Sequence, residues 1–150
     1  RVDAGDVGEM IRRSRTDGFG EEVRRRIMLG TYVLSSGYYD QYYGAAQHAR
    51  RAVVQDFRSV FASGVDALFT PTTPAPAFAL GERLADPLQM YQSDVFTVTA
   101  NLAGVPAMSV PIGTAHGLPF GGQVIAPWWG EASMVAVGGV LEAQSGGRAE

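Results

Sequence analysis

With 150 residues, 46% of them hydrophobic, and a net charge of −3, the chain has the composition of an ordinary folded domain and shows no basic footprint for direct nucleic-acid binding. The absence of cysteine excludes disulfides and thiolate metal sites, and because all 12 basic residues are arginines, no lysine of the chain can act as a base. No apolar run reaches the roughly 18 residues of a membrane span, and residues 1–20 lack a signal-peptide core, so we expect a soluble, cytoplasmic protein.

The first 34 residues predict two helices separated by a turn. Residues 5–17 form a short amphipathic helix, and a second helix begins at Glu21. Four residues mark the buried face of this second helix: Val23, Ile27, Gly30 and Leu34. Arg25 points away from that face, Arg24 and Arg26 flank it, and Glu21–Arg25 and Glu22–Arg26 have i, i+4 spacing. The simplest interpretation of the three arginines is a salt-bridged, solvated helix surface.

A long amphipathic helix is predicted from Tyr38 to Ala62. Its apolar residues recur every three or four positions, as a buried helix face requires: Tyr42, Ala46, Ala49, Val53, Phe57 and Val60. We interpret Ser35-Ser36-Gly37 before it as a helix C-terminus and reject both serines as nucleophiles. His48 is expected on the helix surface. Because it is far in sequence from His116, the two histidines predict no metal site.

Three strands and a final helix follow. A strand buried on both faces is predicted at residues 65–70, and the prolines of 71–76 end it because proline cannot donate to a sheet ladder. Strands are also predicted at 108–112 and at 123–126, the last weakened by Gly121 and Gly122, and a helix at 133–143. This order indicates an α/β fold with a sheet covered by helices. Three strands are few for such a sheet, and with the missing initiator methionine they suggest a piece of a longer protein.

The most informative stretch is Met90–Pro111. Its first half predicts a buried helix in which Asp94, Thr97 and Asn101 share one face among apolar residues, and Gly104 ends this helix. A buried carboxylate is costly unless it is paired. One interpretation is a structural acid that bonds nearby backbone, and the other is one wall of a ligand site.

Three segments, Phe19–Asp40, Asp66–Pro76 and Asp86–Pro111, together resemble the C-terminal third of the amidase-signature enzymes. The specific strings are Arg-Ile-Met-Leu-Gly-Thr-Tyr, Leu-Phe-Thr-Pro-Thr-Thr-Pro and Asp-Pro-Leu-Gln-Met-Tyr-Gln-Ser-Asp. Within that family the chain looks most like the A subunits of tRNA-dependent amidotransferases. The resemblance implies that residues 1–144 are the incomplete C-terminal portion of an α/β/α amidase domain with a mixed sheet, and we expect residues 145–150 to be a disordered tail.

The resemblance also implies the activity of the whole enzyme. A Ser–cis-Ser–Lys triad would release ammonia from glutamine through an acyl-enzyme, and Glu-tRNA(Gln) or Asp-tRNA(Asn) would become Gln-tRNA(Gln) or Asn-tRNA(Asn). The B subunit would activate the mischarged tRNA with ATP and Mg, and the small C subunit would brace the other two. The triad belongs to the N-terminal portion, which agrees with the missing lysine, so this chain is expected to hold no catalytic residue and no cofactor, and to be inactive alone.

Two substrate-binding residues follow from the resemblance. Arg26, immediately before Ile-Met-Leu-Gly, matches the family's clamp for the α-carboxylate of glutamine, and Asp94 matches the acid that holds its α-amino group. The chemistry agrees, because an arginine fork and a carboxylate recognise the two charges of a free amino acid. One departure is Pro119–Gln123, where Pro-Phe-Gly-Gly-Gln replaces the usual Pro-Val-Gly-Leu-Gln. The alternatives are another amidase-signature hydrolase of simple or aryl amides, or a binding module without catalysis.

Overall fold

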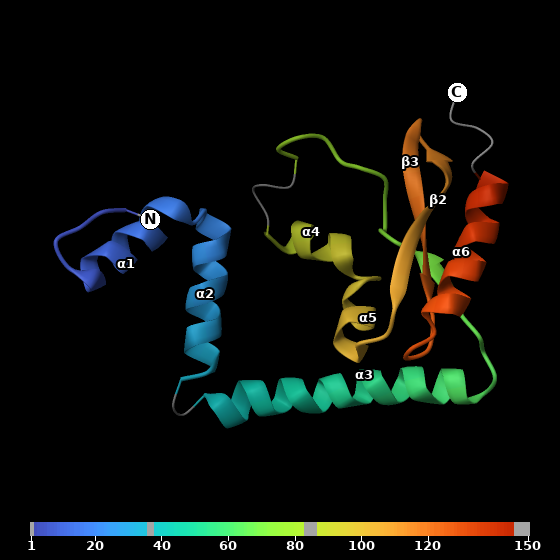
Figure 1. The fold of residues 1–150 in the computed structure, drawn as a ribbon, viewed down its shortest axis with the longest axis horizontal. Helices are drawn as coiled ribbons and strands as arrows, with labels where there is room; N and C mark the ends of the chain where they lie inside the picture. Colours follow the sequence, from blue (N-terminus) through green and yellow to red (C-terminus); the bar gives the residue numbers. More distant parts are fainter. Residues whose placement is uncertain (1, 36–37, 83–86, 146–150) are drawn as a thin grey trace. The chain divides into compact units, whose positions relative to one another are not determined.

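The computed structural model describes residues 2–35, 38–82 and 87–145 (Figure 1). The chain divides into two compact units, Arg1–His48 and Ala49–Glu150, and each is described by itself. The assignment of residues 1–144 to a single amidase domain stays a prediction. None of the helices in the described ranges is long and apolar enough to cross a membrane.

The first unit is helical. It contains α1 (Val7–Gly18), α2 (Glu21–Val33) and a π-helical turn, η1 (Tyr39–Gly44). The Asp6 carboxylate accepts a 2.9 Å bond from the backbone N–H of Glu9 and so begins α1. The prediction of a buried face on α2 is wrong for this chain, because no residue of α2 is buried and Val23 and Ile27 are almost half exposed. The described part of this unit contains no sheet on which such a face could be buried.

Three tyrosines form the aromatic cluster of the first unit. The ring centroids of Tyr32 and Tyr38 are 4.5 Å apart, and those of Tyr38 and Tyr42 are 5.9 Å apart. Offset aromatic pairs of this kind stabilise local packing. These ring contacts join the end of α2 to η1 within the first unit.

The predicted long helix is present, with two corrections. Its first turns are the π-helical η1, and the regular helix α3 spans Ala45–Ala62. Within the second unit, α3 packs on the core through Val53, Val54, Phe57 and Phe61, each partly buried. Phe61 rather than the predicted Val60 therefore continues the apolar face at the C-terminal end of the helix.

The sheet has three strands, β1 (Leu68–Pro71), β2 (Ala107–Ala115) and β3 (Leu118–Ile125), in the order β1-β3-β2. Both pairings are antiparallel, so the mixed sheet expected for the whole fold is represented within the described chain by an antiparallel part. A tight turn at His116 and Gly117 joins β2 to β3, and both residues have positive φ, at 54° and 76°. Two left-handed residues in succession give the twist that a two-residue hairpin requires.

Helices cover both faces of this sheet in the second unit. On one face α6 (Glu131–Ser145) packs against β2 (Figure 1). Gly138 of this helix lies against the side chain of Met108. On the other face, α3 and α5 (Val98–Ala103) enclose a core that contains Ala100, Ala103, Val105 and Ile125. The helix–sheet–helix layering predicted from the sequence is confirmed. Ser145 still belongs to α6, and the rest of the predicted disordered tail, residues 146–150, lies outside the described residues.

The edge strand β1 departs from its prediction of burial on both faces. Phe69 is 52% exposed, because β1 lies at the edge of the sheet and α6 packs mainly on β2. The ring of Phe69 instead lies over Gly122 of β3, where an added Cβ would lie 2.5 Å from the ring and 2.8 Å from the Ile112 side chain. The two glycines that weaken the strand signal therefore make room for neighbouring side chains.

Candidate functional site

The segment that carries Asp94 is a broken helix. The sequence predicts one continuous helix, but the structure shows α4 (Pro87–Tyr91), a 3₁₀ turn η2 (Gln92–Asp94), a non-helical step and then α5. At this step the N–H and the hydroxyl of Thr97 both donate to the backbone oxygen of Asp94, at 2.9 and 3.1 Å. A side chain that competes for a helix carbonyl, in a run rich in β-branched residues, disfavours the regular helix. The prediction of one continuous helix is therefore wrong.

Asp94 is exposed, which corrects the prediction of a buried acid. Its apolar neighbours are also partly exposed, with Val95 at 50% and Phe96 at 37%. Within the described residues, no side chain or backbone donor bonds the Asp94 carboxylate. A carboxylate in contact with solvent carries little desolvation cost, so Asp94 needs no structural partner and is accessible to a solute.

One buried polar residue joins this segment to the sheet. Gln123 of β3 is 3% exposed, and its side-chain nitrogen donates to the backbone oxygen of Phe96 at 2.9 Å and to the hydroxyl of Thr70 at 3.1 Å. Gln123 is not among the site residues predicted from the sequence. The signal that could have found it is an amide between two glycines and a fully apolar run, where a buried polar group requires a partner.

A hollow of about 330 Å³ lies beside this junction. Its polar lining includes Thr97 and Asn101 from the broken-helix segment and Thr72, Ser109 and Gln123 from the sheet side. The hydroxyls of Thr72 and Ser109 are 2.7 Å apart and bond each other. Thr97 and Asn101 thus lie together, as the sequence predicts, and both line this hollow.

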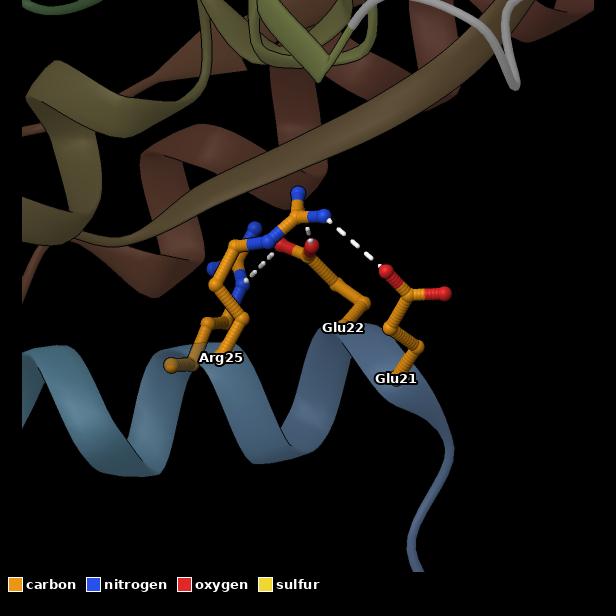
Figure 2. Close-up of polar contacts among 4 residues, drawn as sticks. Glu21, Glu22 and Arg25 are labelled. Atoms are coloured by element: carbon orange, nitrogen blue, oxygen red, sulfur yellow. Dashed lines mark hydrogen bonds and ion pairs between the residues drawn. The ribbon is translucent and has the colours of Figure 1, made fainter.

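The arginine run lies on α2 in the first unit. Figure 2 shows Arg25 reaching back to Glu21 and Glu22, with nitrogen–oxygen distances of 3.5 and 3.1 Å. Arg26 bonds the other oxygen of Glu22 at 2.9 Å. Both predicted i, i+4 pairs are confirmed. The prediction that Arg25 is the most solvated is wrong, because the side chain of Arg26 is 64% exposed and that of Arg25 is 47% exposed.

The two predicted binding residues, Arg26 and Asp94, therefore belong to different units and are both exposed. Their joint role as a clamp stays a prediction. In the described ranges, no three His, Asp or Glu side chains come together as a metal site would require. The geometry offers an accessible cation on a helix surface and, in the second unit, an accessible carboxylate on a turn beside a polar hollow.

The layered fold and the sequence place the chain in a known family of enzymes. The family model described as Amidase matches residues 2–135, and the chain belongs to the amidase family.

Among its relatives, the chain is 54% identical over 148 residues to the A subunit of the Glutamyl-tRNA(Gln) amidotransferase from Xanthobacter autotrophicus, a match that covers 97% of this chain and 30% of that protein. The crystal structure of the protein of the same name from Thermotoga maritima matches with a TM-score of 0.69 and 44% identity, over 92% of this chain and 30% of that one. A crystal structure titled as an amidase matches with a TM-score of 0.71 and 27% identity, over 89% and 30% of the two chains. The chain thus spans about 30% of the length of these relatives.

Proposed function

We propose that the chain is the C-terminal portion of the glutamine-hydrolysing A subunit of a tRNA-dependent amidotransferase. The observation that carries this proposal is 54% identity, over 97% of the chain, to a protein of that name. The parent enzyme would release ammonia from glutamine, and the ammonia would convert Glu-tRNA(Gln) or Asp-tRNA(Asn) to the amidated form. The proposed location is the cytoplasm.

The chemistry of this parent is divided among several parts. The Ser–cis-Ser–Lys triad belongs to the N-terminal portion, since this chain contains no lysine. ATP and Mg act at the B subunit, where the mischarged tRNA is activated, and the C subunit braces the complex. By itself the chain supplies substrate-binding residues and no catalytic group, so we propose that it is inactive alone.

Arg26 and Asp94 are the proposed binding residues for glutamine. The planar guanidinium of Arg26 can donate two parallel hydrogen bonds to the α-carboxylate, and the carboxylate of Asp94 can accept from the α-ammonium. Both residues are exposed in the structure, which leaves them accessible to a solute. Because Glu22 bonds Arg26 at 2.9 Å, the substrate carboxylate would compete with Glu22 or share Arg26 with it.

The test is a glutaminase assay of the full-length enzyme to which this chain belongs, with Arg26→Ala and Asp94→Ala. Arg26→Ala removes the paired hydrogen bonds to the α-carboxylate and Asp94→Ala removes the acceptor for the α-ammonium, so in each variant the KM for glutamine should rise by about 10- to 100-fold with a smaller change in kcat. Arg25→Ala is the matched control, because Arg25 also bonds Glu22 on the same helix, and it should leave KM unchanged. An unchanged KM in both binding-site variants would contradict the clamp.

A second candidate is an amidase-signature hydrolase of simple or aryl amides. The observation in its favour is the 27% identity and 0.71 TM-score to a structure titled only as an amidase. Such an enzyme would have no need to recognise both charges of an amino acid. Comparing kcat/KM for glutamine and for an uncharged amide such as benzamide separates the two functions, since only the second candidate predicts a preference for the uncharged substrate.

A further inference from the structure

We infer that Gln123 is a positioning residue for Asp94 and thereby sets specificity for the α-ammonium group of the substrate. This inference rests on the proposed role of Asp94 in binding glutamine. It depends on a single bond, from the side-chain nitrogen of Gln123 to the backbone oxygen of Phe96, two residues after Asp94.

The orientation of the Gln123 amide follows from its partners. The backbone oxygen of Phe96 can only accept a hydrogen bond, so the atom 2.9 Å from it must be the amide nitrogen. The same nitrogen donates its second hydrogen to Thr70 at 3.1 Å. With both donors occupied and the residue 3% exposed, the amide group is fixed in place.

The turn that Gln123 holds has few other restraints. Between Asp94 and α5 the backbone forms a turn and not a regular helix, and its internal restraint is the pair of bonds from Thr97 to the oxygen of Asp94. The flanking Val95 and Phe96 are 50% and 37% exposed, so packing covers them only in part. In the part of the chain that the structure describes, Gln123 is the sole side chain from outside residues 87–105 that bonds residues 94–97. The bond therefore holds the segment that carries Asp94 in place against β3, the central strand.

The amide oxygen of Gln123 distinguishes this site from a closed structural contact. No described residue donates to that oxygen, yet no side-chain polar atom that is fully buried in the described structure lacks a partner. Gln123 also lines the hollow that Thr97 and Asn101 line, so its side chain borders that space as well as the Phe96 backbone.

The test uses Gln123→Met in the full-length enzyme, because methionine keeps the length of the side chain and removes both donors. Two substrates are compared, glutamine and glutaramate, which has the same amide and carboxylate but no α-amino group. We expect the KM for glutamine to rise about 3- to 10-fold, the effect of one modest hydrogen bond, with kcat and the KM for glutaramate within about 2-fold of wild type. Gln123→Asn, which is too short to reach Phe96, should give the same pattern if the methionine variant folds poorly.

Two controls separate positioning from general destabilisation. Thr70→Val removes the other acceptor of the same amide and leaves the Phe96 bond, so it should leave the KM for glutamine unchanged. In an Asp94→Ala background, Gln123→Met should add no further increase, because the residue that it positions is gone. An equal rise of KM for both substrates, or additive effects with Asp94→Ala, would overturn the inference. If Asp94→Ala itself left glutamine binding unchanged, the proposed role of Asp94 would fail instead.

Discussion

The side-chain nitrogen of Gln123 lies 2.9 Å from the backbone oxygen of Phe96, and this bond joins the central strand to the turn that carries Asp94. The buried Gln123 and the exposed Asp94 thus have different roles. Gln123 satisfies its donors within the protein, whereas Asp94 keeps its carboxylate for solvent or a ligand. A binding residue keeps a precise position only if neighbouring groups hold its backbone in place. For Asp94 this restraint comes from β3, the strand in the middle of the sheet.

Because Phe69 packs over Gly122, a larger residue at position 122 should destabilise the fold, and a smaller residue at position 69 should offset part of that loss. A side chain at position 122 would clash with Phe69 and Ile112, because an added Cβ alone would lie 2.5 and 2.8 Å from them. Gly122→Leu alone should therefore lower the free energy of unfolding by about 1–3 kcal/mol, the usual cost of overpacking. Adding Phe69→Ala should restore part of this loss, because it removes the ring that occupies the space. Urea unfolding of the single and double variants measures the coupling, and strictly additive losses would contradict this account.

Two adjacent glycines of α6 provide a matched pair on the face of the sheet that α6 covers. A Cβ at Gly138 would lie 2.8 and 2.9 Å from the end of the Met108 side chain, whereas one at Gly139 has open space around it. Gly138→Leu should lower the free energy of unfolding by about 1–3 kcal/mol. Gly139→Leu should be neutral or slightly stabilising, since leucine has the better helix propensity. Thermal unfolding of both variants tests the contact between α6 and β2, and equal effects would argue against it.

The tyrosine cluster predicts a pH effect in the first unit. The hydrogen bond with Tyr38 raises the pKa of Tyr32 above its ordinary value, and burial and the nearby Tyr42 act in the same direction. A group with a raised pKa in the folded state stabilises the fold below its ordinary pKa, and this contribution is lost as the pH rises through the raised value. Tyr38→Phe should therefore move one tyrosine titration to lower pH, as measured by phenolate absorbance. Tyr91→Phe also removes one phenol, and as the control it should leave the pKa of Tyr32 unchanged, because only Tyr38 and Tyr42 act on that group.

Much of the fold could be predicted from periodicity and helix-ending residues. Gly104 ends α5 with a φ of 72°, as the sequence indicated, and each of the three strands overlaps its predicted run, although β1 begins only at Leu68 and β3 begins at Leu118, well before the predicted residue 123. The break between Asp94 and Thr97 could not be predicted this way, because the apolar spacing continues through it. It depends on a hydroxyl that bonds a backbone oxygen, which a hydrophobic pattern does not register.

Burial was the less predictable property. The spacing in α2 places Val23 and Ile27 on one apolar face of the helix. Within the described chain, however, the first unit contains no surface that covers them. For the site, Arg26 and Asp94 came from the family resemblance, since charge spacing alone favoured a salt-bridged surface, which is also present. Gln123 required the structure, because its role depends on a partner 27 residues away.

Arg50 is an exposed residue of α3 that also contacts α5. Its side-chain Nε donates to the backbone oxygen of Leu102 at 2.8 Å, in the last turn of α5. A cation at a helix C-terminus interacts favourably with the helix dipole and satisfies a carbonyl that has no partner within the helix.

Arg50→Ala should therefore lower the free energy of unfolding by about 1 kcal/mol, the usual net value of one hydrogen bond. Arg51→Ala is the control, because Arg51 is the adjacent exposed arginine of α3, and surface substitutions of this kind usually change stability by less than about 0.5 kcal/mol. Arg50→Lys should recover only part of the loss, since an ammonium keeps the charge but lacks the planar Nε donor. Denaturant unfolding compares the three variants, and an effect of Arg50→Ala no larger than that of Arg51→Ala would show that the Leu102 contact contributes nothing measurable to stability.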